Sequence, residues 1–282
     1  MNSSSATASD DLGNRVMDAL PYAFVGLYAL WTLVPLVWVG LSSLKSQAAI
    51  INLSFVFEPT LEHYVTIFFD SQVPQFLLNS ILVAGSSALI AVVFGTAGGY
   101  ALSRSEIRGK KHVAFWIIST RMAPIAVAII PLFFLFDFLD LLGTYTALIV
   151  AYSTFNIPFG IWMMRSFFDE IPPAIEEAAL VDGATRWQAF RKTLLPLVSP
   201  GIGATAIISV VFSWNDFLFA FLFSDTGTQT IPVAAAQQIG QSGIDWGSVM
   251  AITMVILVPM IGFGLVVREY LVEGLTMGAV KQ

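Results

Sequence analysis

Long apolar runs alternate with short polar stretches along the chain. Six of the runs reach the length of about 20 residues that a helix needs to cross the hydrocarbon of a bilayer. These runs are 20–41, 76–102, 112–136, 142–164, 201–223 and 246–271. Each run is continuously apolar, whereas a half-buried strand would alternate polar and apolar positions. The pattern therefore predicts an all-α protein with six transmembrane helices.

Composition supports this prediction and excludes several kinds of site. The chain has 282 residues, of which 56% are hydrophobic and 11% charged, whereas a soluble domain is about 25% charged. It contains no cysteine, which rules out disulfides, thiolate nucleophiles and thiolate metal ligands. His63 and His112 are far apart in the sequence and lack ligand spacing. We expect membrane lipid around the chain, no metal and no nucleic-acid partner.

Positive charges gather on one side of the six-span arrangement. All thirteen Lys and Arg residues except Lys45 and Arg121 fall on the side that holds both chain ends. Because Lys and Arg in short loops stay cytoplasmic, we expect both termini in the cytoplasm. The predicted organisation is a cytoplasmic N-terminal tail over 1–19, a membrane domain over 20–272 and a cytoplasmic C-terminal tail over 273–282.

A polar segment at about 168–199 separates the fourth and fifth runs. Pro173 forces Pro172 out of the α region, so the fourth span must end before them and a new helix can begin at Pro173. Asp182 and Gly183 end that helix, since Gly tolerates the positive φ of a helix C-terminus.

Thr185 followed three residues later by Gln188 forms a capping box that starts a second helix. On that helix Trp187, Phe190 and Leu194 share one face. The segment is thus predicted to be a cytoplasmic helix-turn-helix. Small and aromatic side chains together are typical of a docking interface; the alternative is a loop that folds back onto its own helices.

This segment resembles the EAA loop of ABC importer membrane subunits, whose pattern is EAA-x3-G-x9-I-x-L-P. The match runs from Glu177 to Pro196, with Thr193 where the family usually has Ile. The resemblance continues at Asn79 and Ser80, in WNDF at 214–217 and in GLTMGAVK at 274–281. The chain is most similar to the carbohydrate branch of that family, of the type of the maltose importer's smaller membrane subunit.

The resemblance implies the fold of a type I ABC importer permease, whose EAA loop seats in a cleft of an ATPase subunit. It implies an ATPase contact through Glu177, Ala178, Ala179, Asp182, Gly183, Phe190, Leu195 and Pro196. It also implies a second six-span permease subunit, usually a different chain, two copies of an ABC ATPase, an extracytoplasmic solute-binding protein and a sugar or polyol substrate. Contact with the binding protein is expected at Gln237, Gln238 and Asp245, and the location is the bacterial inner membrane.

Motifs for catalysis are missing from the sequence. It has no G-x-x-x-x-G-K-[ST] phosphate loop, no H-E-x-x-H and no G-x-S-x-G. We therefore expect a non-catalytic subunit without a cofactor of its own, in which ATP and Mg²⁺ are bound by the partner ATPase.

Polar residues inside the spans are the candidate substrate contacts, because a charge at the bilayer centre costs roughly 2.5–3.5 kcal/mol. The predicted substrate path comprises Asn79, Arg121, Asn156, Trp214, Asn215 and Asp216. For Asp216 the alternative is a hydrogen bond that only joins two spans. For Arg121 the alternatives are snorkelling to the cytoplasmic interface, a water-filled path or a buried partner.

Two other functional classes are compatible with a polytopic chain. A secondary, ion-coupled solute transporter typically shows paired inverted repeats, and no repeat is evident here. A membrane-embedded enzyme needs several convergent acidic, His or Ser residues, whereas Asp216 and Arg121 are the charges clearly inside spans. Gly95 and Gly99 form a small-x-x-x-small pair, which is suited to close helix packing.

Overall fold

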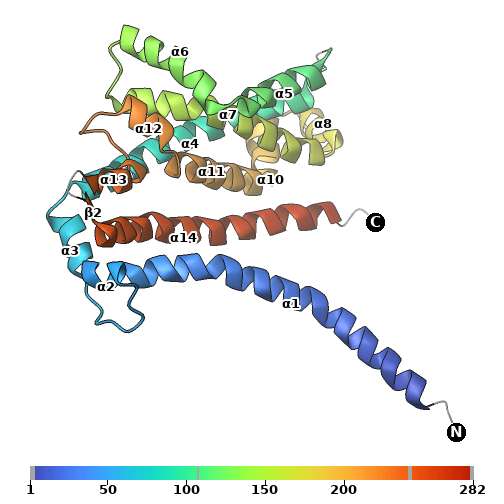
Figure 1. Ribbon diagram of the computed structural model, residues 1–282. Helices are drawn as coiled ribbons and strands as arrows, with labels where there is room; N and C mark the ends of the chain where they lie inside the picture. The colour runs from blue at the N-terminus through green and yellow to red at the C-terminus, as the bar shows by residue number, and fades with distance from the viewer. Residues whose placement is uncertain (1–3, 107, 241–242, 280–282) are drawn as a thin grey trace.

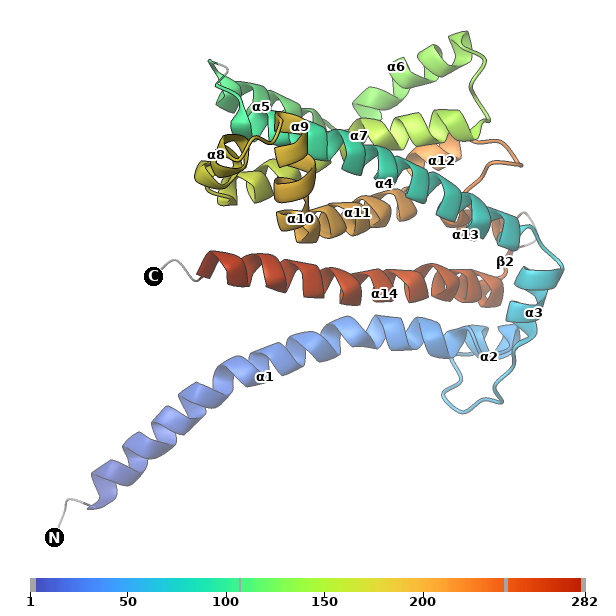
Figure 2. The same ribbon diagram turned by 180° about the vertical axis from the view of Figure 1, so that it is seen from behind.

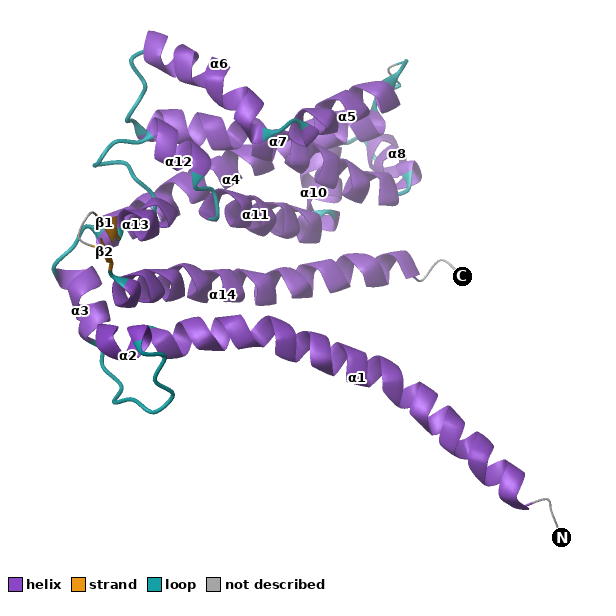
Figure 3. Ribbon diagram, viewed as in Figure 1, coloured by secondary structure: helices purple, strands orange, loops and turns teal. Residues whose placement is uncertain are grey.

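Helices make up most of the protein's described residues. The computed structural model describes residues 4–106, 108–240 and 243–279. Within these ranges, strand structure is limited to an antiparallel hairpin of β1 (Ile239–Gly240) and β2 (Gly243–Ile244) (Figure 3). The predicted all-α class is confirmed.

Four of the described helices are long and apolar enough to cross a membrane unbroken. They are α1 (Ser4–Ser42), α4 (Val73–Arg104), α7 (Tyr145–Glu170) and α14 (Trp246–Ala279). Two further candidate spans are bent pairs, Lys110–Met122 with Ile125–Phe138 and Arg186–Leu197 with Ser199–Trp214, so the described residues provide up to six spans. This number agrees with the six apolar runs. Helix α1 begins inside the segment that was predicted to be an N-terminal tail.

The third predicted span is divided at its first proline. Helix α5 (Lys110–Ser119) and the 3₁₀ turn η1 (Thr120–Met122) are followed by α6 (Ile125–Phe138), which leaves at a bend of 87°. Pro124 has no backbone N–H and disfavours the α conformation of the residue before it. Ala123 is accordingly extended, with φ −64° and ψ 136°. The run 112–136 is a broken span rather than one continuous helix.

The fifth predicted span is divided within WNDF. Helix α11 (Ser199–Trp214) stops before Asn215, and α12 (Leu218–Phe223) starts after Phe217. Asn and Asp side chains compete with helical hydrogen bonds by bonding to nearby backbone. Asn215 Nδ2 donates to the carbonyl of Val211 at 2.8 Å, and Asp216 Oδ1 accepts from the backbone N–H of Phe219 at 3.0 Å. These two side chains end one helix and start the next.

Short elements mark the two ends of the bundle (Figures 1 and 2). At one end, here called the α8 end, lie α8 (Pro173–Val181), α9 (Arg186–Ala189), the π-helical turn η2 (Phe190–Leu194) and α10 (Leu195–Leu197). At the other, the α3 end, lie α2 (Gln47–Ile51), α3 (Glu62–Phe69), α13 (Ile231–Gln237) and the hairpin. The start of α1 and the end of α14 both point toward the α8 end (Figure 1), as an even number of spans requires.

Helices α4 and α7 pack at backbone distance. A Cβ added to Gly95 would lie 2.7 Å from the carbonyl carbon of Gly160, and one added to Gly99 would lie 2.7 Å from the backbone nitrogen of Arg165. Only glycine allows this approach. The close packing expected for Gly95 and Gly99 is confirmed.

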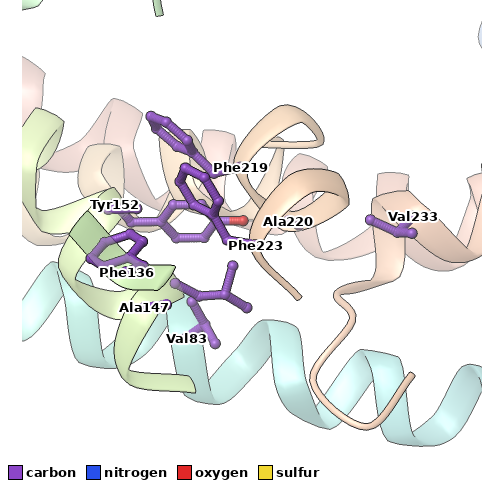
Figure 4. Close-up of a cluster of buried hydrophobic side chains, with 10 residues drawn as sticks. Val83, Phe136, Ala147, Tyr152, Phe219, Ala220, Phe223 and Val233 are labelled. Carbon is purple, nitrogen blue, oxygen red and sulfur yellow. The ribbon is translucent and has the colours of Figure 1, made fainter. Parts of the chain in front are cut away.

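The interior has three apolar clusters along the bundle. The first joins α4, α6, α7, α12 and α13 through Val83, Phe136, Tyr152, Phe219 and their neighbours (Figure 4). The second lies toward the α3 end around Trp214 and Ile231, and the third lies under α9 and η2 around Phe168 and Leu194. Helix α1 packs along α14 and leaves most of its described apolar side chains exposed, as expected for a helix that faces lipid.

Candidate coupling loop and membrane cavity

The polar segment between α7 and α11 has the predicted helix-turn-helix form. Helix α8 begins at Pro173, and the turn that follows it holds Gly183 at φ +88°, a conformation that strains any residue with a Cβ. Thr185 Oγ1 accepts from the backbone N–H of Gln188 at 3.3 Å, and Gln188 Oε1 accepts from that of Thr185 at 2.8 Å. The predicted helix break, glycine turn and capping box are confirmed.

Two adjacent glutamates of α8 have opposite environments. Glu176 is buried, and its carboxylate accepts from Tyr100 Oη at 2.6 Å and from Arg104 Nε at 3.0 Å. Glu177 is exposed, and among the described residues no hydrogen bond or ion pair engages its side chain. Consecutive helix residues point about 100° apart, so the first glutamate anchors α8 and the second faces solvent.

Apolar side chains are exposed beside Glu177. Val181 is 87% exposed and Trp187 is 67% exposed, which is unusual for residues that normally bury most of their area. The exposed residues of this region form what we call the coupling surface: Ile175, Glu177, Ala178, Val181, Asp182, Gly183 and Trp187.

Other predicted contact residues support this surface from below. Phe190 is buried against Tyr100 and Phe168, with ring centroids 4.8 Å and 6.2 Å apart. Leu194 is fully buried, whereas Trp187 stacks on Phe190 at 5.5 Å and keeps an exposed face. The expected common face of Trp187, Phe190 and Leu194 is therefore divided between core and surface. Ala179 and Leu195 are half-buried and Pro196 is exposed.

A cavity of about 290 Å³ lies beside the break before α6 and the interruption between α11 and α12. It is lined by residues of η1, α6, α7, α11 and α12 and of the link between the last two: Arg121, Ile125, Tyr152, Phe155, Asn156, Phe212, Ser213, Asp216 and Phe219. Irregular backbone at membrane depth is tolerated where it lines a cavity or is buried in protein. The structure thus brings Arg121, Asn156 and Asp216 of the predicted path to one site.

Arg121 is held at this cavity by a carbonyl and two aromatic rings. Its Nη1 donates to the carbonyl of Phe155 at 2.9 Å, and its guanidinium carbon lies 3.9 Å from the ring centroid of Phe212 and 5.1 Å from that of Phe159. Within the described chain, no carboxylate oxygen lies within 4.0 Å of it. Cation–π contacts of this kind stabilise a cation in a partly desolvated position.

Asn156 belongs to a buried network that joins three helices. Its Nδ2 donates to Ser213 Oγ at 2.8 Å, and Ser213 Oγ is 2.8 Å from Ser87 Oγ. The network links α7, α11 and α4 beside the cavity. Asn156 therefore joins helices and also lines the cavity.

Three residues of the predicted path lie elsewhere. Trp214 is buried against α14 and donates to the carbonyl of Ile256 at 3.3 Å, and Asn215 is exposed, with Nδ2 3.3 Å from Met260 Sδ. Asn79 holds the loop before α13, because it donates to the carbonyls of Gly227 and Gln229 at 3.0 Å and 2.8 Å. None of these side chains lines the cavity.

A second, more polar cavity of about 660 Å³ opens at the α3 end. It contains the three predicted binding-protein contacts together with an amide from α2, a tryptophan and part of the hairpin: Gln237, Gln238, Asp245, Gln47, Trp246, Ile51, Gly243 and Ile244. Gln47 fixes this arrangement, since it donates to the carbonyl of Ile244 at 2.9 Å and accepts from the backbone N–H of Gly247 at 3.2 Å.

Comparison with known proteins identifies the family of this chain. Residues 95–268 match the family described as the binding-protein-dependent transport system inner membrane component. The chain is a member of that permease family. It is also 34% identical over 263 residues to the trehalose/maltose transport system permease protein MalG of Thermococcus litoralis, covering 90% of this chain and 94% of the relative.

A further relative and a solved structure extend this result. The permease is 36% identical over 255 residues to the trehalose transport system permease protein SugB of Mycobacterium tuberculosis, with 89% and 93% of the two chains covered. Its fold resembles a chain in the crystal structure of a bacterial ABC transporter involved in the import of the acidic polysaccharide alginate. The TM-score is 0.76, the identity is 24%, and 92% and 97% of the chains are covered.

Sequence reasoning missed several residues of this permease that the structure places at its sites. The aromatic wall of the membrane cavity, with Tyr152, Phe155 and Phe219, has no signature that separates it from core. The partners of Glu176 did have a sequence signature, because Tyr100 and Arg104 are four residues apart and so share a helix face. The end of GLTMGAVK, at Val280 and Lys281, lies outside the described residues.

Proposed function

We propose that this permease forms half of the translocation path of an ATP-driven, binding-protein-dependent importer of a sugar or sugar-like solute, and that it docks a separate ATPase through α8. The coupling surface carries this proposal. It presents Glu177 and Val181 of α8 and Trp187 of α9 to solvent, while the buried carboxylate of Glu176 fixes another face of α8.

The chemistry of this surface suits a protein partner. Exposed tryptophan and valine next to a carboxylate offer apolar area with one charged group to set the register, and Trp, Tyr and Arg are the residues most enriched among interface hot spots. The residues below them, Phe190 and Leu194, are packed before any partner arrives. A preorganised surface loses little conformational entropy on binding.

The partner ATPase supplies the energy in this proposal. It binds ATP and Mg²⁺, and this permease holds no cofactor of its own. Two copies of the ATPase serve two permease subunits, each through its own α8. The second permease subunit is a different six-span chain.

Transport then follows from alternating access. Closure of the ATPase pair on ATP moves the two α8 elements together, and the path between the permeases changes from inward-facing to outward-facing. ATP achieves this only because the ATPase pair binds it unequally in the two states. With the coupling surface in the cytoplasm, both chain ends are cytoplasmic too, in agreement with the distribution of Lys and Arg.

The membrane cavity provides the sugar path on this subunit. Aromatic rings of Tyr152, Phe155 and Phe219 offer apolar faces, and Asn156 and Asp216 offer hydrogen-bonding groups. A largely apolar pocket with a few placed polar groups is the usual form of a small-molecule site. Because the lining contains one cationic residue, Arg121, and one acidic residue, Asp216, its formal charges balance, and an uncharged sugar fits better than an anion.

The polar cavity at the α3 end receives the binding protein. Gln237 is exposed and Asp245 half-buried there, on an outward-facing surface if α8 is cytoplasmic. Amides and a tryptophan are suitable for contact with a loaded binding protein or with the sugar it releases. The names of the relatives, which mention trehalose and maltose, support a sugar as cargo.

Reconstitution tests the proposal directly. The permease, its sister subunit and the ATPase are placed in liposomes, and uptake of the solute retained by the binding protein is measured. We expect uptake only with ATP, the ATPase and the binding protein together. Uptake driven by an ion gradient without the ATPase would establish a secondary transporter instead, an alternative that these relatives do not support.

A further inference from the structure

A buried charge cluster ties α8 to a helix that is not its neighbour in sequence. Along the chain α8 connects to α7 and, through α9 to α10, to α11. Its Glu176 nevertheless bonds to α4, where Tyr100 Oη lies 2.6 Å from Oε1 and Arg104 Nε lies 3.0 Å from Oε2. Both side chains of the ion pair are largely buried, at 14% and 9% exposure for Arg104 and Glu176.

The guanidinium of Arg104 also reaches the end of α7. Its Nη2 donates to the carbonyl of Ile171 at 2.9 Å. The last carbonyls of a helix lack partners within it, and Pro172 and Pro173 have no N–H to offer. One planar side chain on α4 therefore bonds to both α7 and α8, which the single charge of a lysine does not reproduce.

A second contact joins the same helix ends. Ser103 Oγ donates to Asp169 Oδ1 at 2.6 Å, and Asp169 pairs with Arg165 at 3.3 Å. Further along the bundle, the glycine contacts of Gly95 and Gly99 keep α4 and α7 at backbone distance. Close-packed interfaces of this kind transmit displacement because they deform little.

We infer that Arg104 and Glu176 are positioning residues that make α8, α4 and α7 one rigid body. Displacement of α8 then moves α4 and α7 with it, although α4 and α8 are far apart in the sequence. In the described part of the chain, no hydrogen bond or ion pair links α8 to α1 or α14. Helix α14 packs mainly on α11 and α13, and α1 packs on α14, so the contacts of Arg104 and Glu176 hold neither of them. We place these two helices outside the rigid body. The inference rests on the proposed docking of an ATPase at α8.

Spin labels test this because the chain has no native cysteine. One pair, Ala174→Cys on α8 with Ala101→Cys on α4, reports within the rigid body; both positions are exposed. The other pair, Ala174→Cys with Ile261→Cys on α14, reports across its boundary. Pulsed electron paramagnetic resonance is recorded on the complete importer in nanodiscs, with and without ATP and vanadate.

The rigid body predicts a different response from each pair. The distance between 174 and 101 stays unchanged and narrowly distributed, whereas the distance between 174 and 261 shifts on ATP and vanadate. An equal shift in both pairs, or a shift confined to 174 and 101, would overturn the inference.

A double variant separates positioning from folding. Arg104→Met with Glu176→Gln removes both charges, so neither is left buried alone, and Gln keeps an acceptor for Tyr100. We expect normal insertion and ATP hydrolysis, but a nucleotide-dependent, broadened distance between 174 and 101. Wild-type distances in this variant would refute the role of the ion pair.

The matched control is Asp169→Asn, which weakens the pairing with Arg165 but keeps an acceptor for Ser103. It should preserve the wild-type distances. Failure of the proposed function looks different from failure of the inference: the wild-type importer would then show no nucleotide response in either pair.

Discussion

The glycine contact between α4 and α7 gives the most quantitative prediction. In Gly95→Ala, the new Cβ lies 2.7 Å, 2.9 Å and 3.1 Å from three backbone atoms of Gly160. Backbone cannot rotate away as a side chain does. Because ordinary contact begins at 3.4 Å, the helices must separate by 3.4 minus 2.7, which is about 0.7 Å, and a gap of about 0.5–1 Å forfeits a quarter to a half of each dispersion contact.

The expected cost is about 3 kcal/mol, the upper end of the range for overpacking. For a domain of this size, that corresponds to a fall in melting temperature of about 5–10 °C. The control is Gly85→Ala on the same helix, where a Cβ meets nothing within 4 Å. It should be neutral or stabilising by up to about 1 kcal/mol, since Ala is the better helix former.

Thermal stability of the detergent-solubilised chain, followed by fluorescence-detected size-exclusion chromatography, measures both variants. The reasoning predicts that only Gly95→Ala melts earlier. Equal melting temperatures for the two variants would show that α4 and α7 do not approach as closely as described, and the rigid body inferred above would lose its basis.

Three further predictions concern the coupling surface and the membrane cavity. Gly183→Pro cannot adopt φ +88°, so pull-down should show an inserted permease that no longer retains the ATPase; normal ATP-driven uptake would contradict the coupling role. Trp187→Ala should weaken ATPase binding about 30-fold, the equivalent of about 2 kcal/mol for a hot-spot residue, while exposed Lys192→Ala should have little effect in the same titration. Asp216→Asn keeps a side-chain acceptor for the backbone N–H of Phe219 and should therefore fold normally but raise the KM for uptake; an unchanged KM would leave Asp216 a purely structural role.

Local chemistry made the helix-turn-helix readable from the sequence. The prolines before α8, the glycine after it and the capping box at Thr185 each act within a few residues, so their spacing fixes the backbone wherever the segment lies. The six apolar runs could also be predicted from the sequence, because they reflect the bilayer rather than any tertiary contact.

The features that the sequence did not predict depend on tertiary contacts. The sequence showed that Pro124 and WNDF interrupt helices or carry polar groups, but not that both breaks meet at one cavity. The EAA pattern assigned the ATPase contact to Glu177, but it did not show that Glu176 is buried, because that depends on Tyr100 and Arg104 of α4. Asn79, Trp214 and Asn215 are polar or aromatic residues within spans, and their partners in the loop before α13 and in α14 decided their place.

Cross-linking from the coupling surface tests the central claim most directly. Val181→Cys would be the only cysteine in this chain, and it is highly exposed on α8; Ile261→Cys on α14 serves as the control. In native membranes we predict a covalent product between Val181→Cys and an ATPase subunit, reached only from the cytoplasmic side, and none from Ile261→Cys. Labelling of position 181 by an impermeant reagent added outside the cell, without any ATPase product, would contradict the account.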